Sequence, residues 1–427
     1  MTGPHVPVPL SAGDREGDAL AVMAEAFKGR RRALKTSLEH QWRPVIMPAL
    51  VLWALATVLS CSILHPFDVA EYEFYAHAAL QAPLLHRLPV EYPAPALLVF
   101  LAPFLLPFSY PWAFAVLAGI VMVVLVASYE GSGVSGMDMA AARRLIVYLA
   151  VGAVILVTGR YDIFAAAATF WSVRAVRQGR WSAAWTWSCI GFVLKLFPAI
   201  FWPALLIAEW RRQGRFPVRR LAWMVASFVV VAGLPALVNA DAALNPLHYY
   251  LRRPNEVESI PAGLSLLVDW HHSQWISSFH DVNVVNGAGH PISVVLEILA
   301  AAGCLWIWRA QLRDRLPIEA VCLATLTLAV LGGKVLSPQY LMWLMPLWAL
   351  YPIRPTWLSA ALVNVVIIPY ITSVQHYSYV PSFPLEVSAT LAFLARDLLV
   401  AWGTWTWLRS VMGERQSSPA SAGARAP

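Results

Sequence analysis

The chain is organised around residues 65–92, which read HPFDVAEYEFYAHAALQAPLLHRLPVEY. This stretch directly follows a long apolar segment, Arg43 to Leu64, and it is too polar to enter lipid. Asp68, Tyr72 and Tyr75 recur at helical spacing within it. We therefore expect an outer loop beside a membrane that bears short surface helices.

The amino-acid composition of the whole chain is that of a membrane protein. Of the 427 residues, 59% are hydrophobic and only 13% are charged, whereas soluble domains have roughly 45–50% apolar and 25% charged residues. Apolar runs of about 17 to 25 residues recur, long enough to cross a bilayer as helices. We predict an all-α polytopic membrane protein with about twelve transmembrane helices. The expected spans are Arg43 to Leu64, Pro111 to Ser128, Arg144 to Thr158, Tyr161 to Val176, Trp181 to Leu194, Phe197 to Glu209, Arg220 to Val238, Pro291 to Trp308, Pro317 to Gly332, Pro338 to Tyr351, Pro355 to Thr372 and Leu385 to Leu408.

Basic residues fall in short clusters between the apolar runs. The net charge of +7 is therefore explained by membrane orientation, and no nucleic-acid partner is expected. Placing these clusters inside puts both termini in the cytoplasm. We expect residues 1–42 to be a cytoplasmic segment with an amphipathic helix at Ala19 to His40, residues 43–408 to be the transmembrane domain, and residues 409–427 to be a disordered cytoplasmic tail.

This orientation allows only one net crossing between Asp68 and Arg143. Two apolar segments lie there, and Tyr92 to Phe108 contains four prolines, each of which removes a backbone donor. We interpret that segment as re-entrant or surface-lying. A full extra span is the alternative, and it would invert the topology of everything that follows.

The unusual polar residues then gather on the outer face, where the loops 65–91 and 239–290 form the expected active-site face. The second loop is rich in histidine and acidic residues, but their spacing matches no metal motif. The four cysteines lie in apolar segments without a CxxC spacing. We expect no metal and no cofactor, and we interpret His271 and His272 as solvated residues or as substrate contacts.

Two residues are the strongest candidates for chemistry. Asp68 can accept the proton of an attacking hydroxyl at the mouth of a membrane cavity, or it can cap the surface helix. Lys195 interrupts an apolar run where two short expected spans meet, and a cation there needs a partner or water. A phosphate would be a suitable counter-ion, and snorkelling to the interface is the alternative.

Other polar residues at the outer ends of spans are weaker candidates. Arg160 and Asp162 flank a tight turn, and we expect them to pair with each other. Lys334 ends an apolar helix in the same way. Its neighbours Gln339 and Tyr340 can hydrogen-bond a sugar or a phosphate, or simply terminate the helix.

Five segments follow one another along the chain: Asp68 with Tyr72, Glu91-Tyr92-Pro93, Gly159 to Asp162, Gly191 to Pro198 with its Lys-Leu-Phe-Pro, and Leu336 to Trp343 with its Ser-Pro-Gln-Tyr. Taken together, these segments resemble glycosyltransferase family 87, a family of GT-C polyprenyl-phosphate-mannose-dependent alpha-mannosyltransferases. The resemblance covers most of the chain from about Arg43 to about Leu350, and the order of the segments is more specific than any one motif.

The resemblance implies a GT-C fold in the plasma membrane and an inverting, metal-independent transfer of mannose. The donor would be a polyprenyl-phosphate sugar, and the acceptor a cell-envelope glycolipid, lipoglycan or polysaccharide. Asp68 matches the family's general base, and the donor phosphate would contact Lys195, with Arg160 and Lys334. The substrate-binding residues that we expect are Tyr72, Glu91, Tyr92, Asp162, His271, His272, Gln339 and Tyr340.

Two other readings of the sequence stay open. A transporter or flippase for a lipid-linked sugar would place polar residues at the midplane and on both faces, often with internal repeats. The polar residues here crowd one face, which favours the enzyme. A noncatalytic subunit that retains the fold is the third reading, because fold alone does not establish activity.

Overall fold

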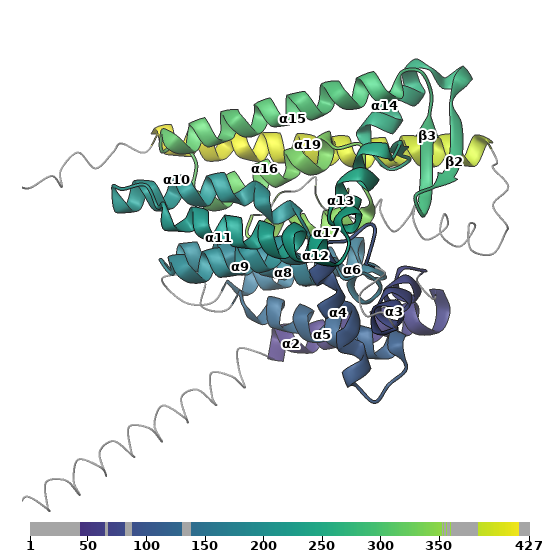
Figure 1. The fold of residues 1–427 in the computed structure, drawn as a ribbon. Coiled ribbons are helices and arrows are strands. Elements are labelled where there is room, and N and C mark those ends of the chain that lie inside the picture. The colour runs from purple at the N-terminus through teal and green to yellow at the C-terminus, as the bar shows by residue number, and fades with distance from the viewer. Residues whose placement is uncertain are drawn as a thin grey trace, which may run out of the picture. The chain divides into compact units, whose positions relative to one another are not determined.

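A computed structural model gives the fold of the protein (Figure 1). It describes residues 43–64, 67–81, 88–129, 138–351 and 383–417, together with residues 353, 356 and 359. The expected amphipathic helix at Ala19 to His40 and nearly all of the expected span Pro355 to Thr372 lie outside these residues. The chain divides into two compact units, Met1–Pro48 and Ala49–Pro427, and the site described below belongs to the second.

Helices make up most of the described chain. In order they are α2 (Arg43–Val58), η2 (Leu59–Leu64), α3 (Phe67–Leu80), η3 (Ala94–Ala96), α4 (Leu97–Leu101), η4 (Ala102–Leu105), α5 (Tyr110–Ala127), α6 (Met139–Gly152), α7 (Leu156–Gly159), α8 (Asp162–Arg177), α9 (Trp181–Leu194), η5 (Phe197–Phe201), α10 (Trp202–Gln213), α11 (Arg219–Phe228), η6 (Val229–Gly233), α12 (Leu234–Val238), α13 (Ala240–Arg252), α14 (Ile260–Val268), η7 (Trp270–His272), α15 (Gly289–Leu312), α16 (Ile318–Gly332), α17 (Pro338–Trp348) and α19 (Phe383–Ser417).

Five of the described helices are long and apolar enough to cross a membrane, so the chain is a helical membrane protein. They are Pro44–Ser62, Tyr110–Ala127, Arg219–Val238, Gly289–Leu312 and Glu386–Glu414. The expected number of about twelve spans is not confirmed. Most of the other expected spans are helical but short, because breaks such as the one at Lys195 end them; α17 has 11 residues and α8 has 16.

The proline-rich segment after residue 92 is not a regular spanning helix. It consists of η3, α4 and η4 in succession. Together they cover Ala94–Leu105, about 18 Å at the rise of an α-helix, well short of a bilayer core. The prolines at 95 and 103 each occupy an early position in one of the two 3₁₀ turns, where a missing donor costs least.

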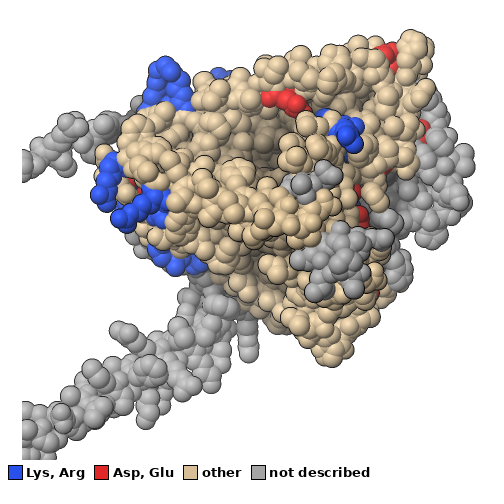
Figure 2. All heavy atoms as spheres, in the orientation of Figure 1, with Lys and Arg blue, Asp and Glu red and all other residues tan. Residues whose placement is uncertain are grey.

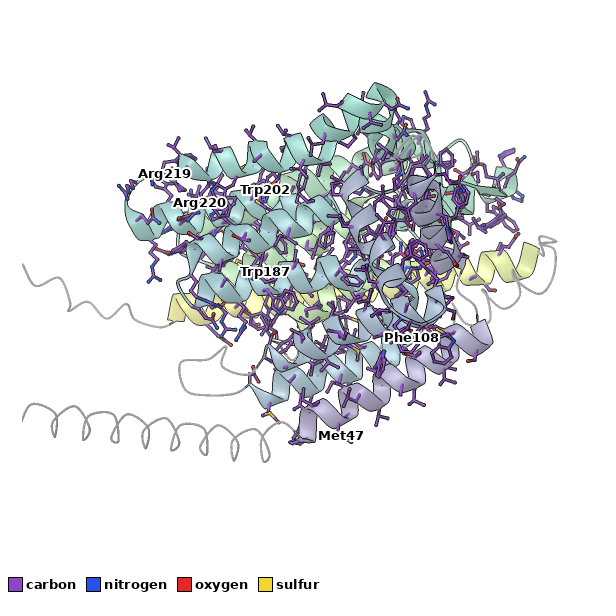
Figure 3. The ribbon with its side chains drawn as sticks, turned by 60° about the horizontal axis from the view of Figure 1, so that its bottom comes forward. Met47, Phe108, Trp187, Trp202, Arg219 and Arg220 are labelled. Atoms are coloured by element: carbon purple, nitrogen blue, oxygen red, sulfur yellow. The ribbon has the colours of Figure 1, made fainter. Side chains whose placement is uncertain are left out.

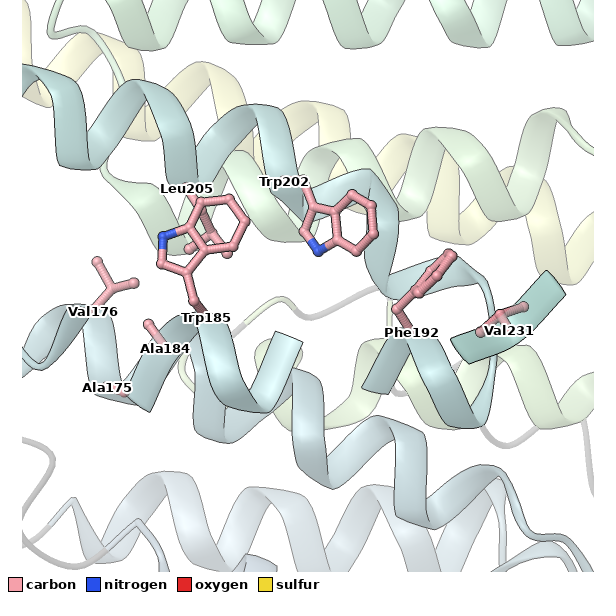
Figure 4. Close-up of a cluster of buried hydrophobic side chains, with 8 residues drawn as sticks. All are labelled: Ala175, Val176, Ala184, Trp185, Phe192, Trp202, Leu205 and Val231. Carbon is pink, nitrogen blue, oxygen red and sulfur yellow. The ribbon is translucent and has the colours of Figure 1, made fainter. Parts of the chain in front are cut away.

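The centre of the fold is an antiparallel pair of helices, α8 and α9, joined at Gln178 to Arg180. Gly179 takes a positive φ of 70° there, which makes the tight connection possible. The hairpin packs against α10 and η6 through a cluster of buried side chains that Figure 4 shows. Trp185 and Trp202 are the largest members of this cluster. The cluster includes Phe192 in the last turn of α9, directly before Lys195, so this end of the helix is anchored in the core.

The structure corrects the all-α prediction in one place. A three-stranded antiparallel sheet, in the order β1-β3-β2, lies within the loop 239–290. Its strands are β1 (Asn255–Glu256), β2 (Gln274–Ser278) and β3 (Asp281–Val285). Phe279 and His280 form the two-residue turn between β2 and β3, both with positive φ (57° and 58°). The prediction missed this hairpin because neither residue is a typical one for a turn of that kind.

The predicted disordered tail is also wrong in part. α19 continues to Ser417, so residues 409–417 are helical, and residues 418–427 lie outside the described chain. The end of α19 has neighbours: Met412 lines a small depression with Trp306 and Arg309 of α15. The helix therefore continues past Leu408, where the expected span ends, and has neighbours there.

The two ends of the helices differ in the charges that they carry. Most of the Lys and Arg side chains visible in Figure 2 gather at the left end, followed by a wide band of uncharged atoms. Arg219 and Arg220 lie at this basic end, whereas Phe108 lies toward the opposite end (Figure 3). In Figure 1 the helix α3 and the strands β2 and β3 lie at the opposite end. The loops that were expected to form the active-site face therefore share the end away from the basic clusters.

Candidate functional site

A cavity of about 780 Å³ lies among α3, α13, the β2–β3 hairpin and the ends of several apolar helices. Its lining combines acidic, basic and aromatic side chains, the mixture typical of a site for polar ligands. The titratable acidic and basic residues in the lining are Asp68, Glu71, Glu91, Arg160, Lys195, Arg253, Glu256, His280 and Asp281. They come from segments far apart in the sequence, so only the fold brings them together.

Asp68 lies in the first turn of α3 and forms an ion pair with Arg160, the residue that follows α7. Both side chains are mostly buried but line the cavity. Burial raises the pKa of Asp68 above its ordinary value; Arg160 opposes the shift, and the charges of Glu91 and Asp281 add to it. A carboxylate with a raised pKa is a stronger base than an exposed aspartate, which suits it to accept a proton from a hydroxyl.

Lys195 lies where α9 ends, in extended backbone (φ −152°, ψ 133°). Its ammonium donates to Asp162 Oδ1 at 2.5 Å, and the Trp343 indole N–H donates to the same oxygen at 2.6 Å. Four aromatic rings also surround the ammonium, with centroids 4.9 to 5.9 Å away. They belong to Tyr92, Tyr161, Tyr340 and Trp343. Burial lowers the pKa of Lys195, and the charge of Asp162 opposes that shift. The ring faces further stabilise the ammonium beside the cavity that it lines.

The expected pair between Arg160 and Asp162 is therefore wrong. Arg160 is extended after α7, and Asp162 begins α8, so the two side chains meet different neighbours. Arg160 binds Asp68, and Asp162 binds Lys195. Two ion pairs replace the predicted one, and each connects elements that are distant in the sequence.

A third group lies at the edge of the cavity formed by α3 and the hairpin turn. Glu71, Glu91 and His280 each offer a ligand atom, and these atoms all lie within 4.8 Å of one another. Burial raises the pKa of Glu71 to about 7, with the charges of Glu91 and Asp68 adding to the shift. Within the described chain, this is the group whose donor atoms could hold a divalent cation.

The cavity brings together most, but not all, of the residues singled out from the sequence. Its lining includes Asp68, Glu91, Tyr92, Arg160, Lys195, Gln339 and Tyr340. Two others lie directly behind it. Asp162 holds Lys195, and Tyr72 is fully buried, with its ring stacked on Phe100 and its hydroxyl without a partner among the described residues.

Three expected site residues are not in the lining. Lys334 donates to the carbonyl of Leu251 at 3.0 Å, and its ammonium lies 5.2 Å from the centre of the Tyr250 ring. His271 and His272 belong to the short turn η7, and the side chain of His272 is 82% exposed and paired with Asp269. The lining of the cavity passes instead through the hairpin turn at His280.

Sequence reasoning missed Arg253, which follows α13 and is buried in the cavity wall. Its Nη2 atom donates to Asp281 at 3.0 Å and lies 3.5 Å from Glu256. One signal could have identified it: Arg252 and Arg253 stand together in a loop predicted to be outside, where basic pairs are unusual. Trp343 was quoted only as the end of a motif, and nothing in its spacing indicates that its indole binds Asp162.

Comparisons with known proteins identify the family to which the chain belongs. The comparison with curated proteins gave no match. The model of glycosyltransferase family 87 matches residues 91–338, more than half of the chain. Arg160, Lys195 and Arg253 lie within the matched residues, and Asp68 precedes them. The chain therefore belongs to glycosyltransferase family 87, a family of membrane glycosyltransferases.

Proposed function

We propose that the protein transfers one sugar, mannose, from a polyprenyl phosphate to a hydroxyl of a cell-envelope glycolipid, lipoglycan or polysaccharide, with inversion at the anomeric carbon. The observation that carries this proposal is that a carboxylate of raised pKa, Asp68, and the ammonium of Lys195 line the same cavity. A base and an anion-binding cation are the two groups that such a transfer needs.

The proposed reaction is a single displacement. Asp68 takes the proton of the acceptor hydroxyl as its oxygen attacks the anomeric carbon. The bond between that carbon and the phosphate oxygen breaks, and its electron pair leaves with the polyprenyl phosphate. Lys195 stabilises the charge that develops on the leaving phosphate, and Arg160 keeps Asp68 ionised and oriented. None of these steps requires a metal ion.

The surroundings of the cavity support a lipid-linked donor. Leu196 and Leu247 both line the cavity and are 39% and 52% exposed. Exposed leucines at a cavity wall suit contact with a prenyl chain arriving from the bilayer, since the chain then never enters water. The position of the cavity away from the basic clusters supports an active site on the extracytoplasmic face of the plasma membrane, with both termini inside. A transporter is favoured less, because its polar site would lie near the midplane.

The test is a transfer assay with purified protein in lipid, radiolabelled polyprenyl-phosphate mannose and a crude envelope-lipid extract. We expect a labelled product with the wild type and none with Asp68→Ala. The matched control is Asp269→Ala, which removes a carboxylate of the outer loops that does not line the cavity, and it should form product normally. Absence of product from the wild type, or equal product from Asp68→Ala, would contradict the proposal.

A further inference from the structure

A second arginine–aspartate pair lines the same cavity as Asp68 and Arg160. Arg253 and Asp281 are 3.0 Å apart and come from the end of α13 and the start of β3. The reaction proposed above gives them no role. Their burial is nevertheless costly, since a charged pair must be desolvated to sit in a cavity wall.

The guanidinium of Arg253 is only partly used by the protein. Nη2 binds Asp281, and Nε lies 3.4 Å from its acceptor, Asn283 Oδ1. The other terminal nitrogen, Nη1, has no hydrogen-bond partner among the residues that the structure describes. Arg253 is 8% exposed overall and lines the cavity, so this part of its donor capacity is left for a ligand.

Arg253 and Asp281 form an ion pair without net charge, with Glu256 beside it, 3.5 Å from Arg253 Nη2. Burial raises the pKa of Glu256 well above its ordinary value; Arg253 opposes the shift, and the neighbouring charge of Asp281 adds to it. The direction of this shift favours the uncharged form of Glu256, which limits the negative charge beside Asp281.

A neutral pair of this kind suits a sugar better than a phosphate. Guanidinium N–H groups and a carboxylate offer donors and acceptors side by side, which matches hydroxyls on neighbouring carbons of a ring. A phosphate would be repelled by Asp281. Two further features fit a sugar: the ring of Tyr249, 5.9 Å from the guanidinium, and the buried oxygen of Gln339, which has no partner among the described residues.

We propose that Arg253 and Asp281 bind a pyranose ring through hydroxyls on neighbouring carbons. This inference rests on the proposed function, because it places one of the two substrates of the sugar transfer. The ring belongs either to the donor sugar or to the acceptor, and the two sources are separated by experiment. Tyr340 connects this subsite with Lys195, since its ring centre lies 5.4 Å from the ammonium and it lines the same cavity as Arg253.

The experiment compares Arg253→Gln with Arg252→Gln. Arg252 is the adjacent arginine, but it is exposed and does not line the cavity. Binding of polyprenyl-phosphate mannose is measured first, without acceptor, and the apparent KM for the acceptor in the lipid extract is measured second. Asp281→Asn is the second variant, since it keeps the shape of the wall and remains informative if Arg253→Gln does not fold.

We expect Arg253→Gln and Asp281→Asn either to weaken donor binding or to raise the apparent acceptor KM, about tenfold or more. Arg252→Gln should stay within about twofold of the wild type in both measurements. A loss of donor binding assigns the ring to the donor, and a raised acceptor KM assigns it to the acceptor. If both variants match Arg252→Gln in both measurements, the inference is wrong.

The outcome is distinguishable from failure of the proposed function. If the wild type transfers mannose but the two variants behave like the control, the function stands and the subsite does not. If the wild type transfers nothing, binding of octyl-mannopyranoside to the same variants still tests the sugar subsite. A loss in Arg253→Gln and Asp281→Asn then supports it, and equal binding by all proteins overturns it.

Discussion

Two buried ion pairs, one at each end of the helices, contain the same kinds of side chain but differ in their remaining hydrogen bonds. At the basic end Glu209 pairs with Arg220 and accepts the indole N–H of Trp185 at 2.7 Å. At the cavity Asp162 pairs with Lys195 and accepts the indole N–H of Trp343 at 2.6 Å. Each pair therefore combines a carboxylate, a cation and a tryptophan.

The two pairs differ in whether both carboxylate oxygens have hydrogen-bond partners. Both oxygens of Glu209 have hydrogen-bond partners, because Gln213 and two nitrogens of Arg220 complete the set. In the other pair both donors share Oδ1 of Asp162, and Oδ2 has no partner among the described residues. A fully satisfied pair is typical of a structural role, whereas the pair at the cavity holds Lys195, which lines the cavity, through a single carboxylate oxygen.

The largest effect on transfer among these tests is expected from Lys195→Met. The substitution removes the cation proposed for the leaving phosphate and leaves Asp162 buried without its charge partner. We expect kcat/KM to fall about 30-fold or more, with weaker donor binding in a direct binding assay. Lys334→Met is the matched control, because Lys334 does not line the cavity; unchanged donor affinity in Lys195→Met would remove Lys195 from the donor site.

A smaller effect, visible as a shift in pH dependence, is expected from Arg160→Gln. Asp68 must be ionised to act as a base, so transfer falls as the pH drops through the pKa of Asp68. Arg160 lowers that pKa, and its removal should move the acidic limb of the kcat profile upward by about one to three pH units. Arg177→Gln breaks an ion pair with Glu319 that is not in the cavity lining, and its profile should match the wild type; a limb that stays in place in Arg160→Gln would exclude Asp68 as the titrating group.

Glu209→Gln tests the structural member of the comparison. Breaking this buried pair should cost about 3 kcal/mol of unfolding free energy, seen as a lower Tm in a thermal melt. Transfer per folded molecule should be unchanged. Asp314→Asn is the control. The Asp314 side chain is 74% exposed and pairs with Arg211, so its loss should lower the free energy of unfolding by less than about 1 kcal/mol. A Glu209→Gln protein of normal stability but impaired transfer would reverse the assignment of the two ends.

The smallest effect is expected from His272→Ala. The imidazole is mostly exposed, binds Asp269 and does not line the cavity. Transfer should stay within about twofold of the wild type, and the free energy of unfolding within about 0.5 kcal/mol. A large loss of transfer would mean that the acceptor reaches beyond the cavity to η7, as the sequence alone suggested.

Hydrophobicity and charge predicted the helical membrane architecture, because apolar length and basic clusters are local properties of the sequence. The spacing of Asp68, Tyr72 and Tyr75 likewise predicted the helix α3, which the structure confirms. The β2–β3 hairpin was missed, since its turn at Phe279 and His280 depends on tertiary contacts, such as the hydrogen bond from the Tyr249 hydroxyl to the Phe279 carbonyl.

The sequence predicted which charged residues belong to the candidate site better than it predicted which of them form ion pairs with each other. A charge within an apolar run stands out in the sequence, as Lys195 and Arg160 do. Its partner is chosen by the fold, and Asp162 proved to bind Lys195 although Arg160 is nearer in sequence. Arg253 was missed because its burial comes from the hairpin, which the sequence did not reveal.

The proposed role of Asp68 as the base of the sugar transfer can be tested on a single catalytic cycle. The single-turnover rate of Asp68→Asn is compared with that of the wild type, with polyprenyl-phosphate mannose saturating and donor binding measured in the same samples. The amide keeps the size of the carboxylate but cannot accept a proton. We expect normal donor binding and a rate lower by about 10²- to 10⁴-fold; a rate close to that of the wild type would show that Asp68 is not the base.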